Sequence, residues 1–149
     1  MENIKRYQRI LVCTDFADPG MTALRRGADL AGCHGARLIL LHVVERFPVD
    51  APNDPIAPED LDPENYYLQS ARRKLQELVS GLGLADVALQ VVMSTNSARD
   101  EIRRVAETER VDLIVLGSHG GAPRDPFGST TMGVTFDLPC DVLVVNPGR

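Results

Sequence analysis

A glycine-rich segment in the last third of the chain has the composition of a phosphate-binding loop. The apolar run of residues 113–116 is typical of a strand buried on both faces, and it stops at Gly117, where glycine and proline become frequent. Glycine lets backbone N–H groups approach a ligand, hydroxyl groups add donors, and the first turn of a helix carries unpaired N–H groups. The segment is predicted to bind an anion, phosphate first, through a few residues: Gly117, Gly120, Gly128, Ser129 and Thr130.

The two common phosphate loops are absent. No Gly-x-x-x-x-Gly-Lys-[Ser/Thr] sequence occurs, and the first strand is not followed by Gly-x-Gly-x-x-Gly. In this chain the glycines follow the fourth predicted strand instead. Simpler interpretations stay open: Gly117 could only end a strand, and Ser129 with Thr130 could only cap a helix, although a cap and a phosphate site share one geometry.

Strands alternate with helices along the chain. Apolar runs predict five strands, at residues 8–14, 37–44, 87–93, 111–116 and 141–145, the third of them nearer an edge of the sheet because it is less continuous. Helical periodicity predicts four helices. The first has Asp18 as its cap and Pro19 at its first position and ends at Gly32 or Gly35. The others run from residue 64 to 81 or 83, from a cap at residue 96 or 97 to about 110, and over 129–138. This order indicates an α/β fold, a doubly wound parallel sheet with helices on both faces.

The chain is interpreted as one domain over residues 1–149, with an exposed loop in its first half. Residues 46–63 are rich in proline and acidic side chains and show no apolar period, which is typical of solvated surface. Neither a second domain nor an internal repeat is visible. A chain of this length buries roughly 70% of its unfolded surface, so its core needs no disulfide or metal.

Composition limits the partners. The net charge of −5, from 16 basic and 21 acidic residues, argues against a broad nucleic-acid or membrane surface. The three cysteines form no Cys-x-x-Cys pair, and no stretch has the length of a signal peptide or membrane span. A cytoplasmic protein is expected, with no resident metal, and Cys13 and Cys140 are interpreted as inert core residues.

The topology predicts where a ligand would bind. In an open parallel sheet, ligands bind beyond the carboxyl ends of the strands, at the point where strand order reverses. If the first strand is central, this point lies between the first and fourth strands. The dipeptide Thr14-Asp15 would then face the segment 117–130, although Asp15 could equally cap a turn.

Several motifs resemble the universal stress protein family. They are Thr14-Asp15 after the first strand, Leu41-His42-Val43 in the second, Gly117-Ser118-His119-Gly120, Gly128-Ser129, and the final Leu-Pro-Cys-Asp-Val-Leu-Val-Val of residues 138–145. The resemblance covers nearly the whole chain, residues 9–147. It implies a Rossmann-like sheet in the order 3-2-1-4-5, related to the adenine nucleotide alpha hydrolase-like folds, and a homodimer.

The resemblance also implies an adenine-nucleotide site. Thr14 and Asp15 would contact the adenosine part, and Val43 or Val44 would lie beside the adenine. Ribose and phosphates would meet the glycine segment, through Gly117, His119, Gly120, Gly128, Ser129 and Thr130. The implied cofactor is ATP, with Mg²⁺ as its cation. His119 could instead only pack the loop, and His42 is interpreted as a hydrogen-bonded core histidine and not as a ligand.

The expected function is therefore a nucleotide-binding module for stress response or signalling, acting on an unidentified protein partner. The ATP-binding branch of the family has the motif Gly-x2-Gly-x9-Gly-[Ser/Thr], whereas seven residues separate Gly120 from Gly128 in this chain. The alternative is a dimeric stress protein that binds no nucleotide. A slow ATPase is a further alternative, but the sequence offers no assured catalytic pair besides Asp15 and His119, so no catalytic residue is assigned.

Overall fold

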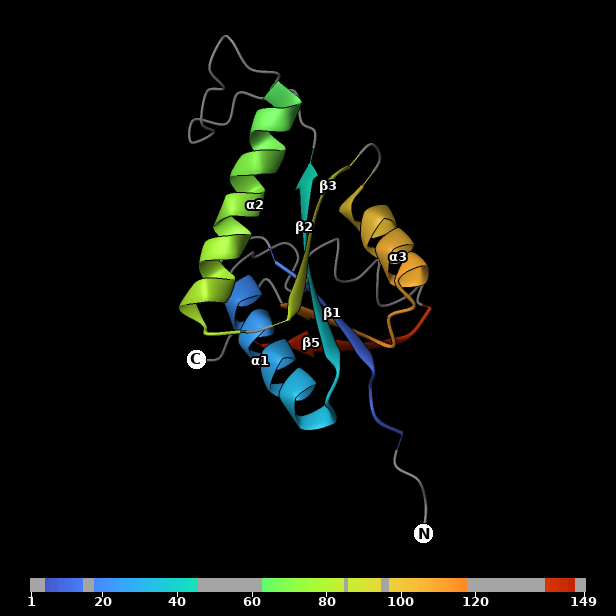
Figure 1. Ribbon diagram of the computed structural model, residues 1–149. Helices are drawn as coiled ribbons and strands as arrows, with labels where there is room; N and C mark the ends of the chain where they lie inside the picture. The colour runs from blue at the N-terminus through green and yellow to red at the C-terminus, as the bar shows by residue number, and fades with distance from the viewer. Residues whose placement is uncertain are drawn as a thin grey trace.

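The computed structural model describes residues 5–14, 18–45, 63–84, 86–94, 97–117 and 139–146. Within them, five parallel strands form one sheet in the order β3-β2-β1-β4-β5 (Figure 1). The strands are β1 (Arg9–Cys13), β2 (Arg37–Glu45), β3 (Val87–Ser94), β4 (Leu113–Gly117) and β5 (Asp141–Val145). The predicted order 3-2-1-4-5 is confirmed, including the position of β3 at an edge.

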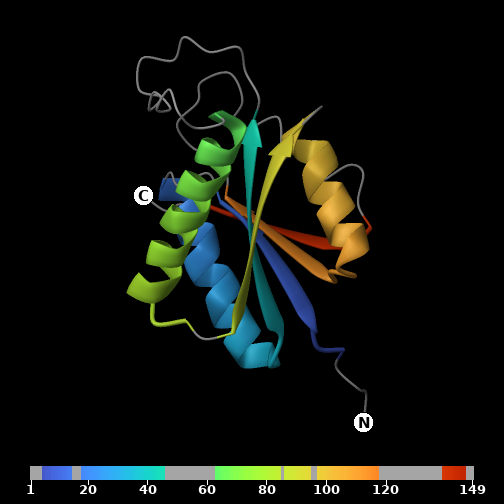
Figure 2. The same cartoon turned by 45° about the horizontal axis from the view of Figure 1, so that its top comes forward.

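Helices cover both faces of the sheet. Helix α1 (Asp18–His34) and helix α2 (Pro63–Gly81) lie on one face, and α3 (Ala98–Thr108) lies on the other (Figure 2). This arrangement confirms the doubly wound α/β class. The helix predicted at 129–138 and the loop predicted from residue 46 lie outside the described residues, except that Pro63 is the first residue of α2. No helix in the described part of the chain is long and apolar enough to cross a membrane.

The core has two layers, because successive side chains of a buried strand point to opposite faces. In β1, Ile10 and Val12 join the cluster under α1 and α2, while Leu11 joins the cluster under α3. All three side chains are fully buried. Because full burial of a leucine or isoleucine side chain is worth about 1.5–3 kcal/mol, such double-sided strands hold the layers together.

Helix α1 lies unusually close to β1. A Cβ atom built on Gly27 would overlap the side chain of Val12. A residue with a side chain at this position would therefore push α1 away from the strand. Gly27 thus lets α1 pack closely on β1, the strand that leads into Thr14.

Some predicted boundaries were wrong by one or two residues. The sequence suggested that the fourth strand stops before Gly117, but Gly117 pairs with Val145 as the last residue of β4. A parallel ladder bonds only backbone groups, so a glycine can continue it. Asp18 was considered as a helix cap, yet it is already the first residue of α1. The caps at the other helix ends agree better: Gly35 follows α1 with φ of 65°, and Ser97 caps α3 by accepting from the Asp100 N–H.

Candidate functional site

Three predicted site residues lie at the carboxyl ends of three adjacent strands. Thr14 follows β1, Val43 is near the end of β2, and Gly117 ends β4. Because β1 pairs with β2 on one side and with β4 on the other, these residues belong to one edge of the sheet. The remaining predicted site residues lie outside the described residues: Asp15, His119, Gly120, Gly128, Ser129 and Thr130.

Thr14 is fixed in place by hydrogen bonds from its backbone to β2. It is 95% buried, since only 5% of its surface is exposed. Its N–H donates to the carbonyl oxygen of Leu41 at 3.0 Å, and its own carbonyl oxygen lies 2.7 Å from Nδ1 of His42. Both partners belong to β2. The end of β1 is therefore fixed by two consecutive residues of the neighbouring strand.

His42 is half-buried and hydrogen-bonded, as the sequence interpretation expected. What sequence reasoning missed is the identity of its partner, the carbonyl group directly before Asp15. The only signal in the sequence was position, because His42 lies on the strand next to β1 and near the same edge. A histidine in an apolar strand gives no indication of which backbone group it contacts.

Val43 supplies apolar surface at this edge. Its side chain is half-buried and packs against the cluster on the α3 face of the sheet. Gly117, one strand beyond β1, has no side chain that could cover its backbone. The half-buried side chain of Val43 is an apolar surface that can receive a flat, partly polar ring.

Ser94 is a further buried polar group at the same edge, and sequence reasoning missed it. It ends β3, pairs with Glu45 in the ladder, and exposes only 4% of its surface. Among the described residues its Oγ has no hydrogen-bond partner. No signal in the sequence indicates its burial, because a serine after an apolar run is also typical of an exposed loop.

Cys13, the last residue of β1, does not add reactivity to this edge. Burial raises the pKa of its thiol to about 12, so the thiol stays protonated at neutral pH. Desolvation, followed by the charges of Asp141 and Asp112, raises the pKa of Cys140 to about 11. In the described ranges no group of three or more His, Cys, Asp or Glu side chains is arranged to hold a metal ion.

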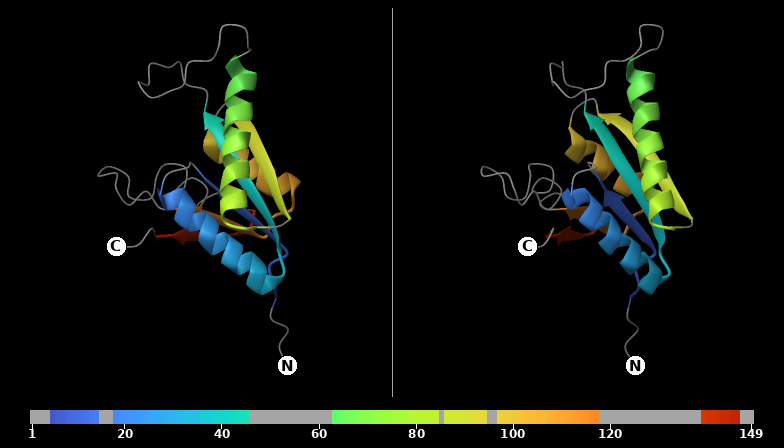
Figure 3. Two further views of the ribbon diagram at one scale, coloured as in Figure 1. Left: turned by 60° about the vertical axis from the view of Figure 1, so that its left-hand side comes forward. Right: turned by 90° about the vertical axis from the view of Figure 1, so that its left-hand side faces the viewer.

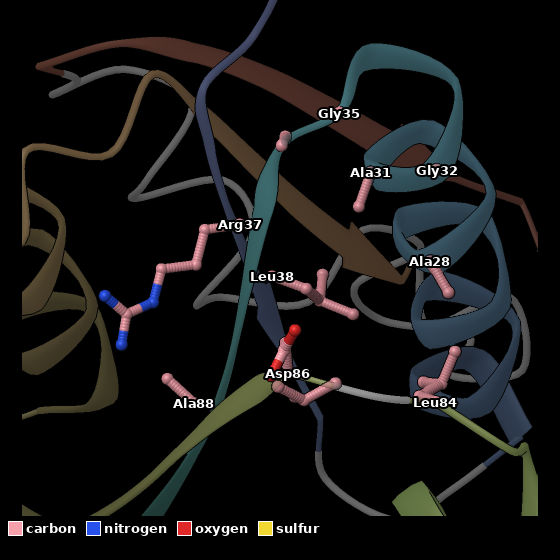
Figure 4. Close-up of a pocket in the computed structure, with 11 residues that line it drawn as sticks. Ala28, Ala31, Gly32, Gly35, Arg37, Leu38, Leu84, Asp86 and Ala88 are labelled. Atoms are coloured by element: carbon pink, nitrogen blue, oxygen red, sulfur yellow. The ribbon is translucent and has the colours of Figure 1, made fainter.

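A pocket of about 870 Å³ lies at the opposite end of the sheet and is a poor candidate (Figure 4). Its walls come from α1, from the starts of β2 and β3 and from residues just before those strands, and many of them are small, among them Ala28, Ala31 and Ala36. Figure 4 shows the side chain of Arg37 extending away from α1, whereas Leu38 points toward that helix. Of the two charged residues that line the pocket, Arg37 thus turns away from α1 and only Asp86 remains, so no cluster of polar side chains marks this hollow as a binding site.

Comparisons with known proteins agree with the fold and the motifs. A model of the universal stress protein family matches residues 6–146. The chain belongs to the universal stress protein family. A universal stress protein from Thermus aquaticus is 30% identical over 146 residues, covering 93% of this chain and 98% of that one.

Solved structures of the family are also similar. A universal stress protein from Methanocaldococcus jannaschii has a TM-score of 0.76 at 26% identity and covers 97% of this chain and 99% of its own. A universal stress protein solved in complex with cAMP has a TM-score of 0.69 at 24% identity, with 97% and 100% coverage. At that identity the second likeness concerns the fold alone.

Proposed function

We propose that this universal stress protein binds an adenine nucleotide, ATP with Mg²⁺, as a stress-response or signalling module. The observation that carries the proposal is the meeting of Thr14, Val43 and Gly117 at one carboxyl edge. That edge includes the point between β1 and β4 where the strand order reverses, which is where open parallel sheets bind ligands.

The residues present fit such a ligand. Val43 offers apolar surface to the flat adenine, and Thr14 with Asp15 faces the adenosine part. Gly117 begins the segment whose later members, His119, Gly120, Gly128, Ser129 and Thr130, would bind ribose and phosphates. Bound nucleotide would order the segment 118–127 and so alter a surface for the unidentified protein partner. A relative of this fold was solved with cAMP, an adenine nucleotide, which supports the proposal at the level of the fold.

Calorimetric titration of nucleotide-free protein with ATP and Mg²⁺ tests the proposal, with AMP as the comparison ligand. We expect micromolar binding of ATP, and loss of that binding in Gly128→Val because a side chain blocks close approach to the phosphates. Gly32→Val is the matched control, since Gly32 is exposed on α1 with no atom within 4 Å of a built Cβ. Undiminished ATP affinity in a folded Gly128→Val protein would contradict the proposed phosphate site.

The second candidate function is a stress protein of the same fold that binds no nucleotide. The observation that favours it is the seven-residue spacing between Gly120 and Gly128, two residues shorter than in the ATP-binding branch. If the calorimetric titration shows no binding heat up to millimolar ATP, this candidate is the correct one. A third candidate, a slow ATPase, requires sustained phosphate release that disappears in Asp15→Ala.

We further propose a homodimer located in the cytoplasm, with no nucleic-acid or membrane partner. The edge strand β5 supports the dimer, because Val142, Leu143 and Val144 are only half-buried there. Light scattering after gel filtration should give twice the mass of 16.3 kDa. A mass of one chain at micromolar concentration would defeat this part of the proposal.

A further inference from the structure

We propose that His42 is a positioning residue that ends the β1–β2 ladder at Thr14 and so keeps the two strands apart where the candidate site begins. The inference rests on the hydrogen bond between its imidazole and the Thr14 carbonyl. This bond is made to the same carbonyl that would accept the next backbone bond in a regular parallel ladder.

The ladder shows which backbone bond is replaced. In a parallel sheet, the N–H and C=O groups of one residue point to the same neighbouring strand, and successive residues alternate between the two neighbours. Arg37 donates to the carbonyl of Gln8 at 2.8 Å, and Leu41 accepts from Thr14 at 3.0 Å. Odd-numbered residues of β2 therefore face β1. One step further along, the N–H of Val43 would donate to the carbonyl of Thr14.

Among the described residues, the β1–β2 ladder has no pair beyond Cys13 with Leu41, whereas β2 and β3 stay paired through Glu45 and Ser94. The carbonyl oxygen of Thr14 meets Nδ1 of His42 at 2.7 Å. The side chain thus bonds the acceptor that Val43 would use, and among the described residues the N–H of Val43 forms no backbone bond to that carbonyl.

The chemistry of the bond fixes the protonation of the ring. A carbonyl oxygen only accepts, so Nδ1 of His42 must carry a proton. Leu38 and Leu40 pack on the α1 and α2 face, and His42 shares that face by alternation along the strand. The imidazole therefore approaches the carbonyl of Thr14 from this face of the sheet.

The consequence for binding rests on the proposed nucleotide site. Thr14 and Val43 are both predicted site residues, and the missing step of the ladder lies between them. Without the imidazole, the N–H of Val43 would take the carbonyl of Thr14, and the ladder would extend by one step. The extension would bring the two strands together between these predicted site residues.

The experiment compares His42→Asn with His42→Gln and His42→Leu. The amide nitrogen of asparagine can occupy the place of Nδ1, whereas that of glutamine reaches the place of Nε2 and leucine offers no donor. Gln90→Leu is the matched control, because it removes a half-buried bond of 3.0 Å, from Gln90 to Glu109, in the neighbouring strand β3. If the leucine variant fails to fold, the polar glutamine variant carries the comparison.

The first readout needs no ligand. In the wild type, nuclear magnetic resonance should show the proton of His42 on Nδ1, and the Val43 amide should exchange about tenfold faster than the ladder amide of Leu41. Exchange at Val43 should become slow in the glutamine and leucine variants and stay fast with asparagine. A proton on Nε2 alone, or a Val43 amide already protected in the wild type, would overturn the inference.

The second readout is ATP affinity, compared among variants that are folded and unfold at the same temperature as the wild type. We expect it to fall about three- to tenfold in the glutamine and leucine variants, which is the weight of one net hydrogen bond, and to stay near wild type with asparagine and with Gln90→Leu. Equal affinity in all variants would overturn the positioning role. If the wild type does not bind ATP, the proposed function is wrong. The amide exchange of Val43 would then still test whether His42 ends the β1–β2 ladder.

Discussion

The two ends of the sheet are built in opposite ways. At the amino end, side chains form hydrogen bonds to backbone groups of neighbouring segments. The Asp112 carboxylate accepts from the N–H of Gln8 at 2.8 Å and from that of Arg9 at 2.9 Å. The Arg9 guanidinium donates to the carbonyl of Glu109 at 2.7 Å. Tyr7 adds a bond from its hydroxyl to Asp141 at 2.8 Å. These contacts join β1, β4 and β5 where the strands begin.

At the carboxyl end the strands differ in length instead. β2 and β3 run on beside α2, past the end of β1 (Figure 3). Thr14 is bonded there by the backbone of Leu41 and by the side chain of His42. Carboxylate and guanidinium side chains thus bond the backbone at the amino end, whereas at the carboxyl end a single imidazole does so among the described residues.

Thiol reactivity should show the largest difference. Cys33 is exposed on α1, whereas Cys13 at the carboxyl end is packed against the core and its pKa is raised to about 12. With a disulfide reagent at pH 8, we expect Cys33 to react about a hundredfold faster or more than Cys13, because only the thiolate attacks. Mass spectrometry of quenched samples would assign the sites, and Cys33→Ser should abolish the fast phase. Equal rates would mean that the carboxyl end opens freely.

Asp112→Ala should cost stability without affecting ligand binding. The substitution leaves two backbone N–H groups without their charged acceptor, and we expect the free energy of unfolding to fall by about 1–3 kcal/mol. Urea unfolding measures this change, and Asp112→Asn, which keeps one acceptor oxygen, should lie between the two. If ATP affinity fell as well at a temperature where the variant is folded, the two ends would not be independent.

Tyr7→Phe should have the smallest effect, about 0.5 kcal/mol, because it removes a single exposed hydrogen bond, the one to Asp141. The hydrogen bond to Asp141, then desolvation and nearby carboxylates, raises the pKa of Tyr7. A raised pKa means that the folded state favours the protonated phenol, so this contribution is present below pH 10 and is lost as pH rises through the folded pKa. Chemical unfolding between pH 8 and 11 should show the wild type losing its advantage over the variant. A constant difference would argue against the bond.

Patterns along the chain predicted most of the fold. The buried runs of β1, β2 and β4 and the cap at Ser97 are local signals, since apolar continuity and a hydroxyl before a helix act over a few residues. The strand order came from the family resemblance, because nothing in residues 37–44 alone says which strand lies next to them.

The candidate site was less predictable. Thr14, Val43 and Gly117 were expected at one edge, but the bond from His42 and the burial of Ser94 depend on where strands of different length end beside each other. Such endings are set by tertiary contacts between segments far apart in sequence. The other predicted site residues lie outside the described residues and stay predictions.

The central position of β1 has a consequence during synthesis. β1 is made first, yet one of its two neighbours, β4, begins only at Leu113. At about 5–20 residues per second, the ribosome needs roughly 5–20 s to complete the intervening chain, and one side of an apolar strand stays unpaired for that time. The pairing of β1 with β4 is thus both central in the sheet and among the last that can form. Copies of the chain that stall or end before β4 leave one side of β1 unpaired, and we expect these copies to aggregate.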